Sequence, residues 1–433
     1  MTSDATQVRD GSPRHAAQTA AQDVPPGYKR TDVGVVPKDW RASQLGDFGT
    51  LRSGNGFPLK HQGRREGDYP FFKVSDMNNP GNELFMDCAN HWIDEDVRRA
   101  LSAEVFPAGS IVFAKIGAAI FLERKRLLVR DSCLDNNMMA YVLTDRGAST
   151  RFFHYVLLRV ELAKLVSTTA LPSLSGRQIA SIRVPIPAPA EQRAIAEALS
   201  DVDGLLGALQ ALIAKKRVIK QAAMQQLLTG KTRLPGFSGE WETKRLGEIA
   251  SIRNQKVMPS QVAPTTPCVE LEHIGQGNGR LTTNSTAAAS TSSKYLFFAG
   301  DVLFGRLRPY LRKYWHAEFD GICTTEIWPL VADSTQADSG FLHGVVQTDR
   351  FIESASISYG THMPRADWGV MRNFEIRVPS VEEQTAIATV LSDMDAEIAA
   401  LEARRDKTRA IKQGMMQQLL TGRVRLVKLE VAA

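Results

Sequence analysis

The sequence of 433 residues lacks several features that would assign it to a common class of protein. Its four cysteines show no CxxC spacing, which disfavours a zinc site or a disulfide framework and predicts reduced thiols. No apolar run reaches the roughly 20 residues of a membrane span; the run 110–122 is interrupted by Lys115. The N-terminus has no charged-then-apolar leader pattern, so we expect a cytoplasmic protein.

Catalytic motifs are also missing. The sequence has no NPPY- or DPPF-like tetrapeptide for attack on adenine, and no GxxxxGK[ST] loop for ATP. GQGNG at 275–279 is not followed by the apolar helix that a dinucleotide-binding loop requires, so we interpret it as a polar surface loop. The histidines are isolated from one another. Asp131 and Asp135 have a spacing that a metal-dependent nuclease could use, but nothing else in the sequence supports a metal site. We therefore expect no catalysis, no metal and no cofactor in this chain itself.

Charge and length point to a multidomain protein with an anionic partner. The chain is too long for one ordinary core, and its net charge of +6 with a pI of about 9.1 only mildly favours a polyanionic partner. Residues 1–26 are rich in Ala, Gln, Ser and Pro with few large apolar residues, which predicts a disordered tail.

An internal repeat organises the rest of the sequence. IKQAAMQQLLTG at 219–230 returns as IKQGMMQQLLTG at 411–422, and the longer stretches 191–230 and 383–422 share 24 of 40 residues without a gap. Their shared polar residues suggest that one kind of partner docks twice; a recent duplication is the alternative, although the intervening segments have diverged far more. These polar residues are the candidate partner-binding set: Lys220, Gln221, Gln225, Gln226, Lys412, Gln413, Gln417 and Gln418.

The repeat extends upstream of these stretches. IRVP precedes each of them, at 182–185 and 376–379, and WRASQLGDF at 40–48 matches WETKRLGEI at 241–249. The chain therefore consists of two tandem units, roughly 28–230 and 231–422.

Each unit contains two kinds of sequence. Residues 40–187 and 241–380 carry short apolar runs bounded by turn residues, which predicts mainly β domains with a few helices, one of them at 152–166. The segments that follow have apolar residues at alternating four- and three-residue steps, the heptad seam of a coiled coil. These seam positions are Ile195, Leu199, Val202, Leu206, Leu209 and Ile213, then Ile387, Leu391, Met394, Ile398 and Leu401.

The predicted fold class is α+β, with two tandem domains separated by two long antiparallel coiled-coil helices and a pseudo-two-fold internal repeat. A bare structural spacer is the simplest reading of the helices. The predicted boundaries are a tail at 1–26, the first domain at 27–187, the first helix at 188–230, the second domain at 231–380, the second helix at 381–422 and a C-terminal tail at 423–433.

Taken as an ordered set, these motifs resemble the specificity (S, HsdS) subunits of type I restriction–modification systems. The stretches that carry the resemblance are 27–47, 184–203, 234–250 and 378–395, with the helix ends MQQLLTG at 224–230 and 416–422. The resemblance implies that each β-rich segment is a target recognition domain for one half of a bipartite DNA site with a non-specific gap. It further implies that the helices bind two methyltransferase (M) subunits, and that restriction (R) subunits join when the complex cleaves.

The resemblance also implies that AdoMet, Mg²⁺ and ATP are bound by the partner subunits, which would methylate adenine at N6. The alternative function is a coiled-coil scaffold that binds only proteins and reads no DNA sequence. The two differ in one measurable property, because neutralising phosphates makes DNA affinity fall steeply with salt.

Candidate DNA contacts follow from the chemistry of base recognition, in which Arg and Lys read guanine while many further contacts go to phosphates. The loops at 167–178 and 357–368 align with Pro172 over Pro364, and basic residues gather elsewhere in both domains. Simple exposure without function is the alternative for each residue. The candidates are Lys73, Lys115, Arg124, Lys125, Arg126, Ser173, Ser175 and Arg177 in the first domain, and Arg306, Arg308, Arg312, Lys313, Thr361, His362 and Arg365 in the second.

Overall fold

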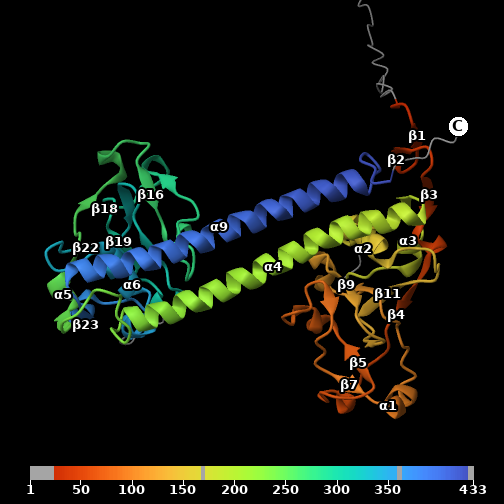
Figure 1. Ribbon diagram of the computed structural model, residues 1–433, viewed down its shortest axis with the longest axis horizontal. Helices are drawn as coiled ribbons and strands as arrows, with labels where there is room; N and C mark the ends of the chain where they lie inside the picture. Colours follow the sequence, from red (N-terminus) through yellow and green to blue (C-terminus); the bar gives the residue numbers. More distant parts are fainter. Residues whose placement is uncertain (1–23, 167–170, 358–362, 428–433) are drawn as a thin grey trace, which may run out of the picture. The chain divides into compact units, whose positions relative to one another are not determined.

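The computed structural model describes residues 24–166, 171–357 and 363–427, which form two compact units. Unit 1 takes in the described residues up to Leu205 together with those from Thr408 onward, and unit 2 comprises Leu206–Lys407. Each contains sheets and helices (Figure 1), which confirms the expected mixture of the two. Within the described ranges, no helix is long and apolar enough to cross a membrane. The predictions for residues 1–23, Thr361 and His362 lie outside the described residues.

Unit 1 is built around a five-stranded sheet in the order β4-β11-β8-β9-β6, with the shorter sheets β10-β5-β7, β12-β3 and β1-β2. Its strands are β1 Tyr28–Thr31, β2 Gly34–Pro37, β3 Arg41–Gln44, β4 Gly49–Ser53, β5 Tyr69–Phe72, β6 Phe85–Met86, β7 Trp92–Ile93, β8 Ile111–Ala114, β9 Lys125–Leu128, β10 Cys133–Leu134, β11 Met138–Leu143 and β12 Arg183–Ile186. Its short helices are α1 Glu95–Ala100, α2 Thr150–Arg159 and α3 Gly176–Ala180.

Unit 2 contains the sheets β14-β22-β19-β20, β15-β18-β21-β16-β17 and β13-β23. Its strands are β13 Glu242–Arg245, β14 Ala250–Ile252, β15 Lys256–Val257, β16 Pro267–Val269, β17 Ser285–Thr286, β18 Lys294–Phe297, β19 Val302–Gly305, β20 Tyr314–His316, β21 Gly321–Thr324, β22 Ile327–Ala332 and β23 Glu375–Val378. Its short helices are α5 Leu246–Ile249, α6 Ser339–Val346, α7 Asp349–Ser356 and α8 Trp368–Met371.

The repeated IRVP and Trp motifs meet in each unit. The first IRVP lies largely in β12, which pairs antiparallel with β3, directly after Trp40. In unit 2, β23 pairs in the same way with β13, directly after Trp241. Both tryptophans are buried. Each repeat therefore closes its domain by pairing a strand from its beginning with a strand from its end.

Two 39-residue helices, α4 Pro189–Leu227 and α9 Val381–Leu419, contribute to both units. In unit 1, Asp203 of α4 pairs with Lys412 of α9 at 2.5 Å, and Glu191, near the start of α4, pairs with Arg425, just after α9. The two helices therefore run antiparallel in this unit. The predicted seam positions are buried or half-buried, as with Leu199 in unit 1 and Leu391 in unit 2.

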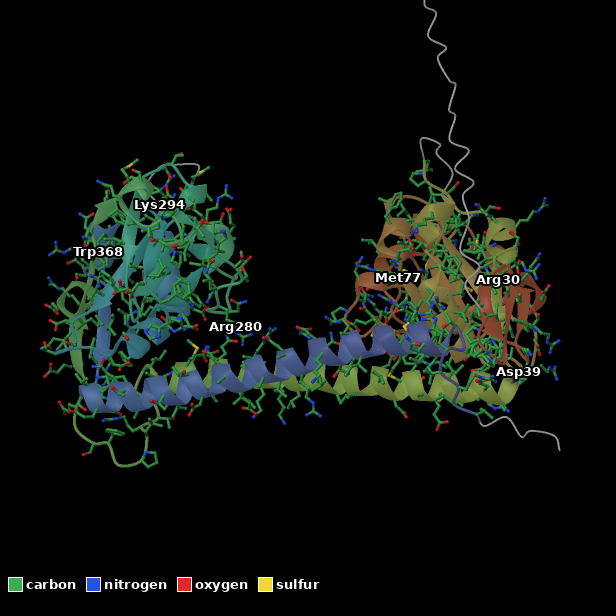
Figure 2. The ribbon with its side chains drawn as sticks, turned by 90° about the horizontal axis from the view of Figure 1, so that it is seen from above. Arg30, Asp39, Met77, Arg280, Lys294 and Trp368 are labelled. Atoms are coloured by element: carbon green, nitrogen blue, oxygen red, sulfur yellow. The ribbon has the colours of Figure 1, made fainter. Side chains whose placement is uncertain are left out.

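The segments of α4 and α9 that belong to unit 2 are also joined by an ion pair. Lys220 of α4 pairs with Asp395 of α9 at 2.6 Å. Arg280, from the loop after the GQGNG stretch, reaches α9 and pairs with Glu402 there (Figure 2). The polar loop at 275–279 thus leads into a contact with the long helix rather than into a nucleotide-binding turn.

Repeated charged residues fix the start of each long helix. In unit 1, Arg425 binds the buried Glu191 and also Asp39, which is labelled in Figure 2, and the Trp40 indole donates to Glu191 at 2.9 Å. In unit 2, Arg233 binds the buried Glu383 at 2.5 Å. These shared residues therefore have a structural role.

The helix expected at 152–166 is shorter than predicted. α2 ends at Arg159, and Val160 is extended before a 3₁₀ turn at Leu162–Leu165. The Lys125 ammonium donates to the Val160 carbonyl at 2.8 Å, and the Glu123 carboxylate accepts the amides of Leu162 and Ala163. These side chains satisfy the backbone groups that continued helix would have paired.

Candidate nucleic-acid interface

Three loops of unit 1 meet at the end of β8. The Lys115 amide donates to the Asn137 carbonyl at 2.7 Å, and the Gly117 amide donates to the Pro172 carbonyl at 2.8 Å. The Leu174 amide returns a hydrogen bond to the Lys115 carbonyl at 3.0 Å. We call residues 115–117, 135–137 and 172–174 the loop junction of unit 1.

Unit 2 contains the same arrangement. The Arg306 amide donates to the Glu326 carbonyl at 2.9 Å, the Arg308 amide to the Pro364 carbonyl at 2.8 Å, and the Ala366 amide to the Arg306 carbonyl at 2.8 Å. Residues 306–308, 324–326 and 364–366 form the loop junction of unit 2. The alignment of Pro172 with Pro364 thus has a structural basis.

The backbone in both junctions adopts a positive φ at the same place, +83° at Gly117 and +52° at Arg308. Such a value is uncommon for a residue other than glycine. It turns the chain out of the strand and into the short 3₁₀ turns Ala118–Leu122 and Pro309–Leu311. These turns present the exposed apolar side chains of Phe121 and Tyr310.

Several candidate DNA contacts lie at these junctions with side chains available to a ligand. Arg308 is exposed, and its guanidinium forms no ion pair or hydrogen bond with another residue in the described ranges. The half-buried Lys115 is likewise without a side-chain partner in the part of unit 1 that the structure describes. Two exposed residues follow the junction of unit 1: Ser175, whose side chain caps α3 by accepting from the Gln178 amide, and Arg177.

The other candidates of the unit 2 junction are held in place. The Arg306 guanidinium lies 5.6 Å from the centre of the Trp328 ring, and its Nε is buried without a hydrogen-bond partner. Arg365 forms an ion pair with Glu326, whose hydrogen bonds raise the pKa of Arg365. Ser173, the residue of unit 1 that corresponds to Arg365, is half-buried and bridges to Ile116.

Two of the predicted DNA contacts have their ammonium groups engaged inside their own units. Lys125 is 1% exposed, pairs with Glu123 and donates to the Val160 carbonyl, so it belongs to the interior of unit 1. Burial lowers its pKa, an effect that the carboxylate of Glu123 opposes. Lys313 donates to the carbonyls of Leu271 and Ile274 at 2.6 and 3.0 Å and thereby fixes a loop of unit 2.

Of the four remaining basic candidates, three have hydrogen-bond or ion-pair partners for their side chains, and Arg126 has none in the described part of unit 1. Arg124 binds Asn78, and Lys73 donates to Gln62 at 3.0 Å. Arg126 is half-buried with its Nε unpaired; burial lowers its pKa, and the neighbouring Arg124 lowers it further. Arg312 pairs with Asp349. None of these four is a member of a loop junction, but the charge of Lys73 acts on Asp135 of the unit 1 junction, where it opposes the rise in the pKa of that carboxyl that burial causes.

The candidate partner-binding residues divide into two groups. Lys220 and Lys412 are held in the ion pairs with Asp395 and Asp203. The glutamines remain at the surface and are exposed except for Gln418, which is half-buried: Gln221, Gln225, Gln226, Gln413, Gln417 and Gln418. Beside them, Ile219 is 41% exposed in unit 2, and the corresponding Ile411 is 51% exposed in unit 1. The repeat thus places an exposed isoleucine among glutamines in each unit.

The prediction from sequence missed the third loop of each junction. Asn136 and Asn137 occupy it in unit 1, and Thr325 and Glu326 occupy it in unit 2. The available signal was the polar turn directly before an apolar strand, DNN before MMAYVL and TTE before IWPLVA. Among the described residues, no group of three or more His, Cys, Asp and Glu side chains could hold a metal ion.

Comparison with known proteins identifies relatives along nearly the whole chain. The family model "Type I restriction modification DNA specificity domain" matches residues 37–216 and 238–409. The type I restriction enzyme MjaVIII specificity subunit of Methanocaldococcus jannaschii is 24% identical over 91% of this chain and 95% of that protein. The EcoDI specificity subunit of Escherichia coli is 23% identical over 90% of this chain and 88% of that protein.

Solved structures share the fold. A type I restriction–modification S subunit from M. genitalium aligns with a TM-score of 0.57 at 15% identity, covering 88% of this chain and 96% of that chain. A chain from work on complex assembly and conformational transition of the type I R-M system aligns with a TM-score of 0.50, also at 15% identity, over 90% and 99% of the two chains.

Proposed function

Because the chain belongs to the type I restriction–modification DNA specificity family and is a specificity subunit, we propose that its two units each read one half of a bipartite DNA target. The bases between the two halves would be unspecified. The chain would recognise DNA without catalysing a reaction, and its partner subunits would supply AdoMet for adenine N6-methylation and ATP and Mg²⁺ for cleavage.

One observation carries this proposal: the same loop junction occurs in both units with different side chains. Three backbone hydrogen bonds of nearly equal length define each junction. At corresponding positions, unit 1 has Lys115 and Ser173 whereas unit 2 has Arg306 and Arg365. A shared backbone with different polar side chains suits two readers that contact DNA alike but distinguish different bases.

The repeated helix surface supports docking of two methyltransferase subunits, one on each unit. The exposed isoleucines at 219 and 411 stand among repeated glutamines that make no contribution to the ion pairs of α4 and α9. An apolar side chain surrounded by polar, uncharged ones is a composition suited to a protein interface. Repetition of the surface then gives two equivalent sites, and a complex of one specificity subunit with two methyltransferase subunits.

Co-expression of the full chain with the methyltransferase encoded beside it, in a host without DNA methylation, tests the proposal. Single-molecule sequencing then maps the modified adenines. We expect a two-part motif with an unspecified centre. A stable complex that methylates nothing and shows no salt-dependent affinity for DNA would favour the protein scaffold. A continuous motif would refute the assignment of one half-site to each unit.

A further inference from the structure

The loop junction of unit 2 contains an ion pair between two of its loops. The Nε of Arg365 lies 3.2 and 3.1 Å from the two carboxylate oxygens of Glu326, and Nη2 lies 3.1 Å from Oε1. The carboxylate therefore lies along one edge of the guanidinium, the edge formed by Nε and Nη2.

This ion pair contributes little to the stability of the fold. The side chains are 44% and 30% exposed, and ion pairs at such positions contribute about 0–1 kcal/mol. The backbone around them is already fixed without the pair, because Arg306 and Arg308 bind the carbonyls of Glu326 and Pro364 through their amides. The remaining consequence of the pair is the orientation of Arg365.

This orientation leaves one edge of the Arg365 guanidinium, the edge between Nη1 and Nη2, without a partner among the described residues. A guanidinium has five N–H donors, and a carboxylate along the Nε and Nη2 edge leaves the terminal edge between Nη1 and Nη2 unoccupied. Two parallel donors at that spacing match O6 and N7 of guanine in the major groove, the commonest base-specific contact of arginine.

The other two arginines of the junction suit different roles. The side chain of Arg306 is packed against Trp328 with a buried Nε, so its freedom to adjust to a base edge is small. Arg308 is exposed and has no side-chain partner in the described ranges, as expected of a contact that neutralises a phosphate without fixed geometry. Arg365 alone of the three is both accessible and oriented by a second side chain.

We propose that Arg365 reads a guanine in the half-site recognised by unit 2, and that Glu326 is the positioning residue that orients it. This inference rests on the proposed function. The corresponding residues of unit 1 are Ser173 and Asn137, and the Asn137 side chain donates to Asp135 at 3.2 Å. That pair has no guanidinium, so unit 1 distinguishes its base at this position by different chemistry and the two half-sites differ.

The test compares methylation maps of the complex containing the wild-type chain with those of R365A, R365K and E326Q. R365A and R365K should both relax one G·C pair in one half of the motif, reducing discrimination against other bases by about 10- to 100-fold. Lysine keeps the charge but lacks the two parallel donors, so relaxation in R365K separates base reading from a phosphate contact. E326Q should relax the same base pair to a smaller extent and leave every other position unchanged.

E242Q serves as the matched control, because Glu242 also forms an accessible ion pair in unit 2, with Lys244 at 3.1 Å; its map should equal that of the wild type. Thermal unfolding of each complex identifies any variant that fails to fold, and R365K and E326Q retain a polar side chain of similar size. An unchanged motif in folded R365A and R365K would overturn the reading of a base. Relaxation in R365A but not in E326Q would overturn the positioning role. Failure of the wild type to produce a two-part motif would instead refute the proposed function.

Discussion

Replacing Arg308 by alanine should lower the salt dependence of DNA binding by the amount expected for one phosphate. Arg308 is exposed at the loop junction of unit 2, and its side chain is unpaired within the described residues. Each neutralised phosphate contributes about 0.9 to the slope of log K against log salt concentration. Between 50 and 200 mM salt, the affinity advantage of the wild type over R308A should therefore shrink about 3.5-fold.

Two variants control this measurement. R308K keeps the charge, and since lysine and alanine both have a Cβ, R308A and R308K meet the same backbone constraint at φ +52°. Alanine at Lys231, an exposed lysine of unit 2 outside the junction, removes the same net charge. The assay is fluorescence anisotropy of a labelled duplex with the full chain bound to its methyltransferase, over a series of KCl concentrations. Equal slopes for R308A, R308K and the wild type would refute the placement of Arg308 at the phosphates.

Three further predictions concern the interior and the helix surface. K125M should destabilise unit 1 by about 2–3 kcal/mol, because it leaves the Glu123 carboxylate without its buried partner. Denaturation measures this loss, and anisotropy should show an unchanged salt dependence of DNA binding. A weaker salt dependence in K125M would mean that Lys125 contacts DNA. Burial lowers the pKa of His154 to about 4 in the folded protein, whereas the unfolded value is about 6.5. Between these values a proton binds preferentially to the unfolded chain, so unit 1 loses stability as the pH falls from about 6.5 toward 4. Hydrogen exchange of unit 1 should show this loss, of about 3 kcal/mol, in the wild type and much less of it in H154Q; equal losses would contradict the assignment. Q225A combined with I219D should remove one of two bound methyltransferase subunits in native mass spectrometry, and Q417A with I411D the other; loss of neither would place docking elsewhere.

The repeat made much of the architecture predictable from sequence. The two Trp motifs and the two IRVP motifs were separate signals, and the structure joins them as the paired strands β3 with β12 and β13 with β23. Helix seam positions such as Leu199 and Leu391 followed from heptad spacing and are buried. These features are local sequence patterns that occur twice, and such patterns can be recognised without knowledge of tertiary contacts.

The direction of individual basic side chains was not predictable in the same way. Arg124, Lys125 and Arg126 look like one basic patch, but β9 begins at Lys125 and side chains alternate along a strand. Lys125 therefore faces the interior, in register with Phe113, while Arg126 lies on the other face of the sheet. A strand of four residues in a charged stretch gives no periodic signal strong enough to reveal this alternation.

Ion pairs between residues far apart in the chain could not be predicted from the sequence either. Glu326 and Arg365 are separated by 39 residues, and they come together because the loops of both residues bond to the backbone at 306–308. Lys220 and Lys412 were grouped with the repeated glutamines, yet their partners Asp395 and Asp203 recur in the same repeat. Repetition of a polar residue therefore indicates either a shared partner or a shared internal contact, and the two are distinguished only when both helices are placed.

Whether each unit reads one half-site is tested by comparing the modified adenines produced by the wild-type complex with those produced by the R365A complex. We expect a two-part motif with an unspecified centre in the wild type, and a change confined to one half of it in the variant. A continuous motif, or a change in both halves, would contradict the assignment of one half-site to each unit.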